Sequence, residues 1–164
     1  MIPIYELFLK NNIPKKILDI VSKIEYNNFN DENKYIIRSV EEVLKSKKGI
    51  YYELVEVQRE LFEKNNYEIK TYFSYEKLPI TDNPTHTYLI FKENNKYYYF
   101  ESSWYKNRGI HGEFKNYNKT VKYVEKCLKD ISKWKSVNTI EYKRFNYNNM
   151  NINQFGEYIL KNFT

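Results

Sequence analysis

The sequence predicts an α+β fold in which N-terminal helices pack on a central antiparallel sheet. Before residue 64, apolar residues recur with a helical period of about 3.6 residues. From residue 68 the pattern changes to the alternation that is typical of strands. Two β-rich runs then flank an Asn-Asn pair, which suits a tight hairpin turn. The 164 residues suit one domain, residues 1–164, with a core of its own.

Helical patterns come first along the chain. An apolar turn near the N-terminus is formed by Ile4, Leu7 and Phe8. The next helix begins near Pro14, because proline suits the first helical turn, and carries the stripe Ile17, Ile20, Val21 and Ile24. A loop over residues 27–33 separates it from a helix that begins after Ser39, whose hydroxyl suits an N-cap. A longer helix, the one expected to pack on the sheet, runs from about Tyr51 to Glu63.

Strands and two further helices follow. Strands are expected at Glu68–Tyr75, Thr85–Phe91, Tyr97–Glu101 and Thr139–Phe145. A helical stripe is formed by Val121, Val124, Cys127, Leu128, Ile131 and Trp134. A last helix carries Ile152, Phe155, Ile159 and Phe163. The order of helices and strands contains no internal repeat and no linker of domain length.

The hairpin register predicts a specific polar contact. If Asn94 and Asn95 form the turn, Tyr88 lies opposite Glu101, and His86 is diagonal to Glu101 on the same face. Diagonal neighbours on adjacent strands are about 7–8 Å apart at the backbone, within reach of long side chains. The register alone therefore predicts a hydrogen bond between His86 and Glu101.

Composition limits the functional classes. The net charge is +6, but lysines are mixed with acids and no arginine-rich block occurs, so we expect no specific nucleic-acid binding. The single cysteine, Cys127, excludes an intrachain disulfide and a cysteine cluster, and two histidines are too few for a His-rich zinc site. We therefore expect no metal and no cofactor. No apolar stretch has transmembrane length and no signal peptide is evident, which favours a cytoplasmic protein without membrane contact.

Three ordered segments suggest a family. They are Gly49–Glu53, Pro84–Tyr88 and Tyr99–Trp104. Further segments with the same pattern are Arg38–Leu44, Lys47–Gly49, Tyr52–Glu56, Arg59, Phe62, Thr71–Phe73 and Gly109–His111. Together they resemble bacterial transglutaminase-like domains over most of the chain. The resemblance implies a papain-like fold whose nucleophile helix packs on an antiparallel sheet, with a Cys thiolate, a His base and an acid that orients the His.

The resemblance places Tyr51 at the nucleophile position, with His86 as the base and Glu101 as the acid. A phenol has an ordinary pKa of about 10, against about 8.5 for a thiol, and it is bulkier and a poor acyl carrier. Loss of a triad nucleophile can cost on the order of a millionfold in turnover. We therefore expect an inactive relative in which Tyr51 fills the vacated pocket at a helix N-terminus, facing His86. Tyr52 and Trp104 are candidate binding residues.

Each candidate residue also has a structural interpretation. His86 and Glu101 can simply satisfy one another as a buried pair. Cys127 is a poor replacement nucleophile, because it lies on the apolar face of its helix and buried Cys is usually inert packing. Trp104 suits a core or a pocket wall. His111 lies between Gly109 and Gly112, which favours an exposed loop.

Three functions remain open at this point. The first is a non-catalytic binding or structural domain that uses the remnant cleft for a peptide or protein ligand. The second is a hydrolase or acyltransferase in which His86 and Glu101 act with a nucleophile other than Cys. The third is a basic domain that binds nucleic acid. A cleft closed over Tyr51 favours the first. An open cleft with an exposed His86 favours the second, and basic side chains gathered on one face favour the third.

Overall fold

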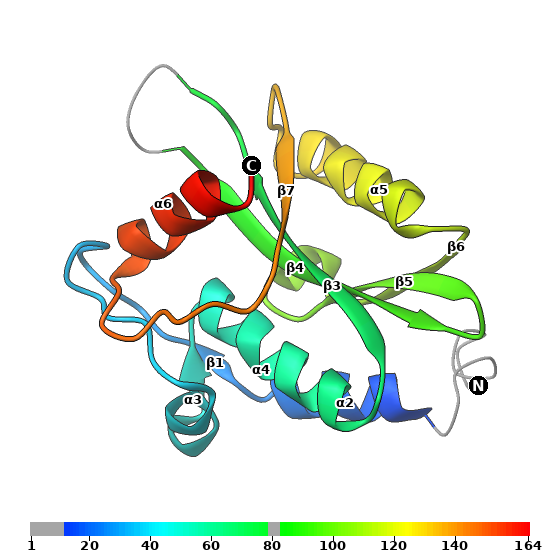
Figure 1. The fold of residues 1–164 in the computed structure, drawn as a ribbon, viewed down its shortest axis with the longest axis horizontal. Helices are drawn as coiled ribbons and strands as arrows, with labels where there is room; N and C mark the ends of the chain where they lie inside the picture. Colours follow the sequence, from blue (N-terminus) through cyan, green and yellow to red (C-terminus); the bar gives the residue numbers. More distant parts are fainter. Residues whose placement is uncertain (1–11, 79–82) are drawn as a thin grey trace.

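The computed structural model describes residues 12–78 and 83–164, and in it helices cover both faces of a five-stranded antiparallel sheet (Figure 1). Across the sheet, the strands lie in the order β6 (Gly109–Phe114), β5 (Lys96–Glu101), β4 (Thr85–Glu93), β3 (Glu68–Tyr75) and β7 (Asn138–Tyr142). A separate parallel pair is formed by β1 (Glu25–Tyr26) and β2 (Lys48–Gly49). The expected α+β class is confirmed.

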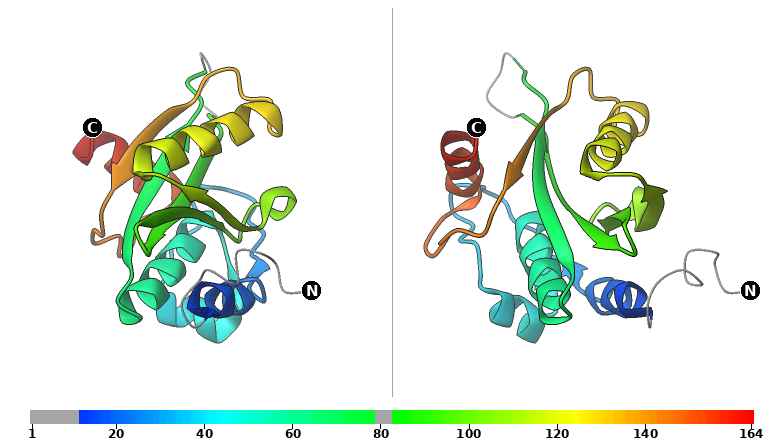
Figure 2. Two further views of the ribbon diagram at one scale, coloured as in Figure 1. Left: turned by 90° about the vertical axis from the view of Figure 1, so that its right-hand side faces the viewer. Right: turned by 45° about the vertical axis from the view of Figure 1, so that its right-hand side comes forward.

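The helices divide between the two faces of the sheet. They are α2 (Ile13–Val21), α3 (Val40–Ser46), α4 (Tyr51–Lys64), α5 (Tyr117–Asp130) and α6 (Ile152–Asn162), with a short 3-10 turn at Tyr105–Asn107. Figure 2 shows α5 on one side of the sheet, with α4 and α6 on the other. We call these sides the α5 face and the α4 face.

Local sequence signals explain where several elements begin. Proline occupies the first turn of α2. Ser39 caps α3: its hydroxyl accepts a hydrogen bond from the Glu42 amide, and the Glu42 carboxylate accepts one from the Ser39 amide. Asn94 and Asn95 have φ values of 53° and 60°, so the β4–β5 turn uses the left-handed conformation that asparagine tolerates.

Alternation along β4 divides the apolar core between the two faces. Leu89 and Phe91 pack on the α4 face in one cluster with Phe62 of α4. Tyr88 and Ile90 point the other way and pack in a cluster with residues of α5. The sheet is therefore buried on both faces, and neighbouring residues of β4 belong to different halves of the core.

Most expected elements are confirmed, with several differences. The short strands β1 and β2 were not expected, and β7 ends at Tyr142 rather than at Phe145. The strand Gly109–Phe114 was not expected, because its two glycines hide the alternation. Helix α5 begins at Tyr117 and ends at Asp130, so Ile131 and Trp134 follow the helix rather than belong to it. The turn expected at residues 4–8 and part of the loop before Pro84 lie outside the described residues. In the described ranges, no helix has the length and apolar character needed to cross a membrane.

Candidate functional site

His86 and Glu101 meet as the hairpin register predicts. Leu89 pairs with Phe100 and Glu93 with Lys96, which is the register set by an Asn94-Asn95 turn. The Nε2 atom of His86 lies 2.8 Å from Oε2 of Glu101. The predicted contact between the two side chains is therefore confirmed.

Glu101 is almost completely surrounded by donors. Its Oε1 atom accepts hydrogen bonds from the backbone amides of Ser103 and Trp104, both at 2.8 Å. Its Oε2 atom also accepts a hydrogen bond from the Tyr99 hydroxyl. Burial acts to raise the pKa of this carboxyl. The charge and hydrogen bond of His86, together with the hydrogen bonds from Tyr99 and Trp104, outweigh the effect of burial, so the pKa of Glu101 is lowered. Glu101 is thus held as a carboxylate in the interior.

His86 is closed off from solvent on the α5 face. The residue is 6% exposed. Its ring stacks on Tyr88 at a centroid distance of 5.7 Å and meets the ring of Trp104 edge-on at 5.5 Å. Trp104 itself packs against the cluster that α5 covers. This environment is that of a buried, satisfied pair, and it favours the structural interpretation of His86 and Glu101.

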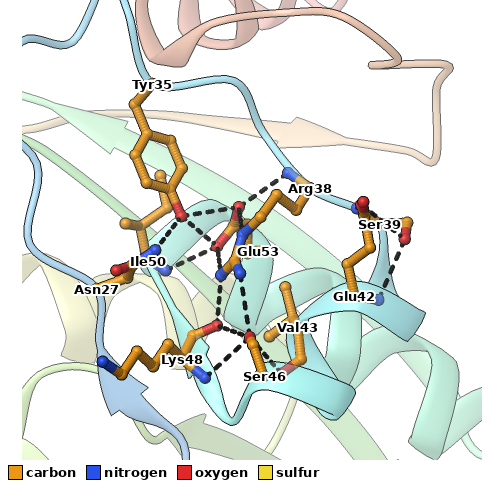
Figure 3. Close-up of polar contacts among 10 residues, drawn as sticks. All are labelled: Asn27, Tyr35, Arg38, Ser39, Glu42, Val43, Ser46, Lys48, Ile50 and Glu53. Carbon is orange, nitrogen blue, oxygen red and sulfur yellow. Dashed lines mark hydrogen bonds and ion pairs between the residues drawn. The ribbon is translucent and has the colours of Figure 1, made fainter.

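A second buried carboxylate fixes the start of α4 (Figure 3). Glu53 is 1% exposed and accepts hydrogen bonds from the amides of Ile50 (3.0 Å) and Arg38 (2.8 Å) and from the Tyr35 hydroxyl (3.0 Å). The Arg38 guanidinium forms an ion pair with it at 3.2 Å and also donates to the carbonyl of Lys48. One side chain therefore ties the first turn of α4 to the segment before α3 and to β2.

The Glu53 network was not predicted from the sequence. Its only signal was the position of an acid three residues after the helix N-cap, as in a capping box. Residue 50 is an isoleucine and has no side-chain acceptor, so the reciprocal half of the box is missing. The first-turn amides of α4 are consequently left for another acceptor.

An open cleft of about 470 Å³ lies beside this first turn, a size typical of ligand sites. We call it the α4 cleft. Its lining is formed by Tyr26, Phe29, Glu32, Tyr51, Tyr52, Phe73, Asn83, Pro84, Thr85, Ile152, Asn153, Gly156, Glu157 and Leu160. The residues come from β1 and the segment after it, α4, β3, the start of β4 with the two residues before it, and α6. The cleft therefore depends on the tertiary fold rather than on one motif.

The two tyrosines at the start of α4 have different roles in the cleft. Tyr52 is 4% exposed, stacks on Phe155 at 4.5 Å and places its hydroxyl 3.3 Å from Oγ1 of Thr85. Tyr51 is 36% exposed, and its ring lies 5.3 Å from that of Tyr26. Tyr52 therefore forms part of the cleft floor, whereas Tyr51 and Tyr26 form an aromatic rim.

The expected meeting of Tyr51 with His86 is wrong. Thr85 lines the α4 cleft, and His86, the next residue of β4, points to the opposite face with Tyr88. Among the described residues, no hydrogen bond or ring contact joins Tyr51 to His86. The expectation that Tyr51 fills a vacated pocket as core is also wrong, because its side chain is at the cleft rim. Trp104 lies with His86 and does not line the cleft.

Cys127 and His111 lie away from the α4 cleft. Cys127 is a partly buried free thiol on α5. Burial and the neighbouring Cys127 raise the pKa of Tyr123 to about 12. His111 lies on β6 rather than in a loop, and its ring nitrogens lie 2.8 Å from the Tyr123 hydroxyl and 2.7 Å from the carbonyl of Asn107. The first contact joins β6 to α5, and the second joins β6 to the 3-10 turn that precedes it.

Neither the search for a metal site nor the comparison with known proteins assigns a function to these residues. Within residues 12–78 and 83–164, no group of three or more His, Cys, Asp or Glu side chains is arranged to hold a metal ion. No protein-family model matches the chain, and no curated protein is significantly similar to it. The functional argument therefore depends on the geometry of the α4 cleft and of the His86–Glu101 pair.

Proposed function

We propose that this protein is a catalytically inactive, transglutaminase-like domain that binds a peptide or protein segment in the α4 cleft. The observation that carries the proposal is the separation of an open, aromatic cleft from the histidine–carboxylate pair. The cleft lies on the α4 face beside Tyr51, and the pair is buried on the α5 face. A ligand in the cleft therefore meets a binding surface without the base that acyl transfer needs.

The resemblance to transglutaminase-like proteins supports the architecture of this proposal. A helix with Tyr51 as its first residue packs on an antiparallel sheet, and His86 and Glu101 lie on adjacent strands in the family's order. In the resemblance, Tyr51 takes the sequence position of the family's cysteine, but its side chain does not face His86. The lack of a thiol there, and of a contact with His86, both favour binding over catalysis.

The chemistry of the cleft suits an extended peptide. Tyr26, Tyr51 and Leu160 expose 43%, 36% and 37% of their surface at its edge, which provides apolar area for a partner to cover. Asn83 and Asn153 add amide groups, which can bond to a peptide backbone. The uncapped first turn of α4 offers N–H donors to a peptide carbonyl. Aromatic anchors with a few polar groups are typical of binding sites.

The test is a screen of immobilised random peptides, followed by an NMR titration of ¹⁵N-labelled protein with the strongest binder. We expect shifts of the amide signals of Tyr51, Thr85 and Gly156, and weaker binding after Tyr51→Ala. Tyr105→Ala is the matched control, because Tyr105 is 80% exposed and does not line the cleft. Shifts centred on α5, or equal losses in both variants, would contradict the proposal.

A further inference from the structure

The positive charge of the chain is concentrated in one segment. Residues 115–133 contain six lysines and two acids, so 19 of the 164 residues carry a net charge of +4 out of the total of +6. The lysines recur at alternating spacings of four and three residues, which is the period of one helix face. They are Lys115, Lys119, Lys122, Lys126, Lys129 and Lys133.

Helix α5 places the central lysines on its outer face. Each residue turns the helix by about 100°, so the four lysines inside α5 fall within an arc of about 80°. Val124 and Leu128 lie on the opposite side and are buried against the sheet, whereas all four lysines are exposed. Figure 2 shows α5 along the outside of its face of the sheet. We call these four residues the α5 lysine row: Lys119, Lys122, Lys126 and Lys129.

The row is almost free of neutralising acids. Lys126 lies 4.0 Å from Asp130, but both side chains are mostly exposed, and such a pair contributes little. In the part of the chain that the structure describes, the other three lysines of the row form no ion pair. The second acid of the segment, Glu125, accepts a hydrogen bond from the Thr139 hydroxyl at 2.8 Å. The row is therefore available to an external anion.

The length of the row suits a polyanion rather than one small anion. From Lys119 to Lys129 the helix rises about 15 Å, at 1.5 Å per residue, so the four ammonium groups cannot converge on a single phosphate. A nucleic-acid duplex presents about nine phosphate charges over the same length of its axis. Lysine binds phosphate as a point charge, and phosphate contacts carry no sequence information.

Two other polyanions fit the helix less well. A helix that lies on a membrane inserts its apolar face, but that face of α5 is buried on the sheet. Proteins that bind single strands add aromatic rings on which the bases stack. The tyrosines of α5 are half-buried and engaged: the Tyr117 hydroxyl donates to Glu68 at 3.0 Å, and the Tyr123 hydroxyl lies 2.8 Å from Nδ1 of His111. The outer face of α5 thus offers charge alone.

We propose that α5 binds the phosphate backbone of a nucleic-acid duplex through its lysine row, without reading the base sequence. This agrees with the expectation that the protein has no specific nucleic-acid ligand, because lysines on phosphates give affinity without sequence preference. The row and the α4 cleft lie on opposite faces of the sheet, so the inference goes beyond peptide binding and does not depend on it.

The test is fluorescence anisotropy of a short, labelled DNA duplex titrated with the protein. An RNA duplex of the same sequence distinguishes the two sources of the phosphate backbone, and binding of either supports the inference. We expect the affinity to fall by about a hundredfold between about 50 and 200 mM salt, because four lysine–phosphate contacts give a log–log slope of about −3.6. Duplexes of unrelated sequence should bind equally within about twofold.

Two variants with the same net charge separate the row from the overall charge. Replacing the four lysines of the row with glutamine should weaken binding by about tenfold or more at low salt and flatten the salt dependence. The control replaces four exposed lysines on other parts of the chain with glutamine and should retain affinity within about threefold. The control positions are Lys16, Lys23, Lys45 and Lys161.

An NMR titration of the unchanged, ¹⁵N-labelled protein with the unlabelled duplex provides a second test. Amide signals of α5 should shift, and those of Tyr51 and Gly156 at the α4 cleft should not. Equal losses in the two variants, no binding of either duplex at low salt, or shifts centred away from α5 would overturn the inference. Binding to vesicles of anionic lipid but to neither duplex would also overturn it and would assign the row to a membrane surface. None of these results alters the test of peptide binding in the cleft.

Discussion

Replacing Glu53 with alanine should destabilise the protein more than any loss of a surface charge. The carboxylate has no exposed side-chain surface and accepts from two backbone amides, the Tyr35 hydroxyl and the Arg38 guanidinium. Each buried donor left without an acceptor costs about 1–3 kcal/mol. Arg38 is 25% exposed at its side chain and keeps its bond to Lys48, so its share of the loss is partly recovered by solvent.

These terms give an expected loss of about 3–5 kcal/mol in the free energy of unfolding, the range for breaking a buried pair from one side. The assay is urea unfolding followed by circular dichroism and tyrosine fluorescence. Glu60→Ala is the control in the same helix, because Glu60 pairs with Lys64 near the surface and should cost less than about 1 kcal/mol. A loss below about 1 kcal/mol for Glu53→Ala would refute the assigned role of this network.

Two further perturbations test the buried charges. Arg59→Ala should lower the free energy of unfolding by about 3–5 kcal/mol, because it leaves Glu56 buried without its ion pair. The control is Lys70→Ala, which breaks a half-exposed pair with Glu141 and should cost less than about 1 kcal/mol in the same unfolding assay. The lowered pKa of Glu101 should make the fold acid-sensitive: this contribution is complete above the ordinary carboxyl pKa of about 4.5 and is lost as pH falls through the lower folded value. Unfolding curves measured as the pH is lowered should show less dependence on pH for Glu101→Gln, and an unchanged dependence would contradict the assignment.

Local patterns were sufficient for most of the helices and strands and for one polar contact. Helix α4 and strand β3 follow from a clear change of period, and the Asn94-Asn95 turn fixes the register that joins His86 to Glu101. Each of these features depends on residues that are close in sequence or paired across one turn. That is why a single sequence predicts them.

The cleft could not be predicted in the same way. Tyr51 and Tyr52 are neighbours of the same type, and packing by α6 decides which ring is buried: Phe155 stacks on Tyr52. Tyr26 and Glu32 lie in a stretch without periodicity. Tyr26 reaches the cleft because β1 pairs with β2 just before α4, and Glu32 reaches it through the bond between its carbonyl and the Ile152 amide of α6. The transglutaminase-like pattern placed Tyr51 opposite His86, but strand alternation turns His86 to the other face.

The most direct measurement is the labelling rate of a cysteine introduced at Tyr51. Tyr51→Cys is made in a Cys127→Ser background, with and without His86→Gln, and each folded variant is treated with iodoacetamide. Because the rim position is exposed and separated by the sheet from His86, we predict ready labelling at rates that agree within about twofold. This is the result expected if the cleft binds ligands without a histidine-activated site. Slowing by about tenfold or more on removal of His86 would show that the histidine acts at residue 51 and would contradict the account.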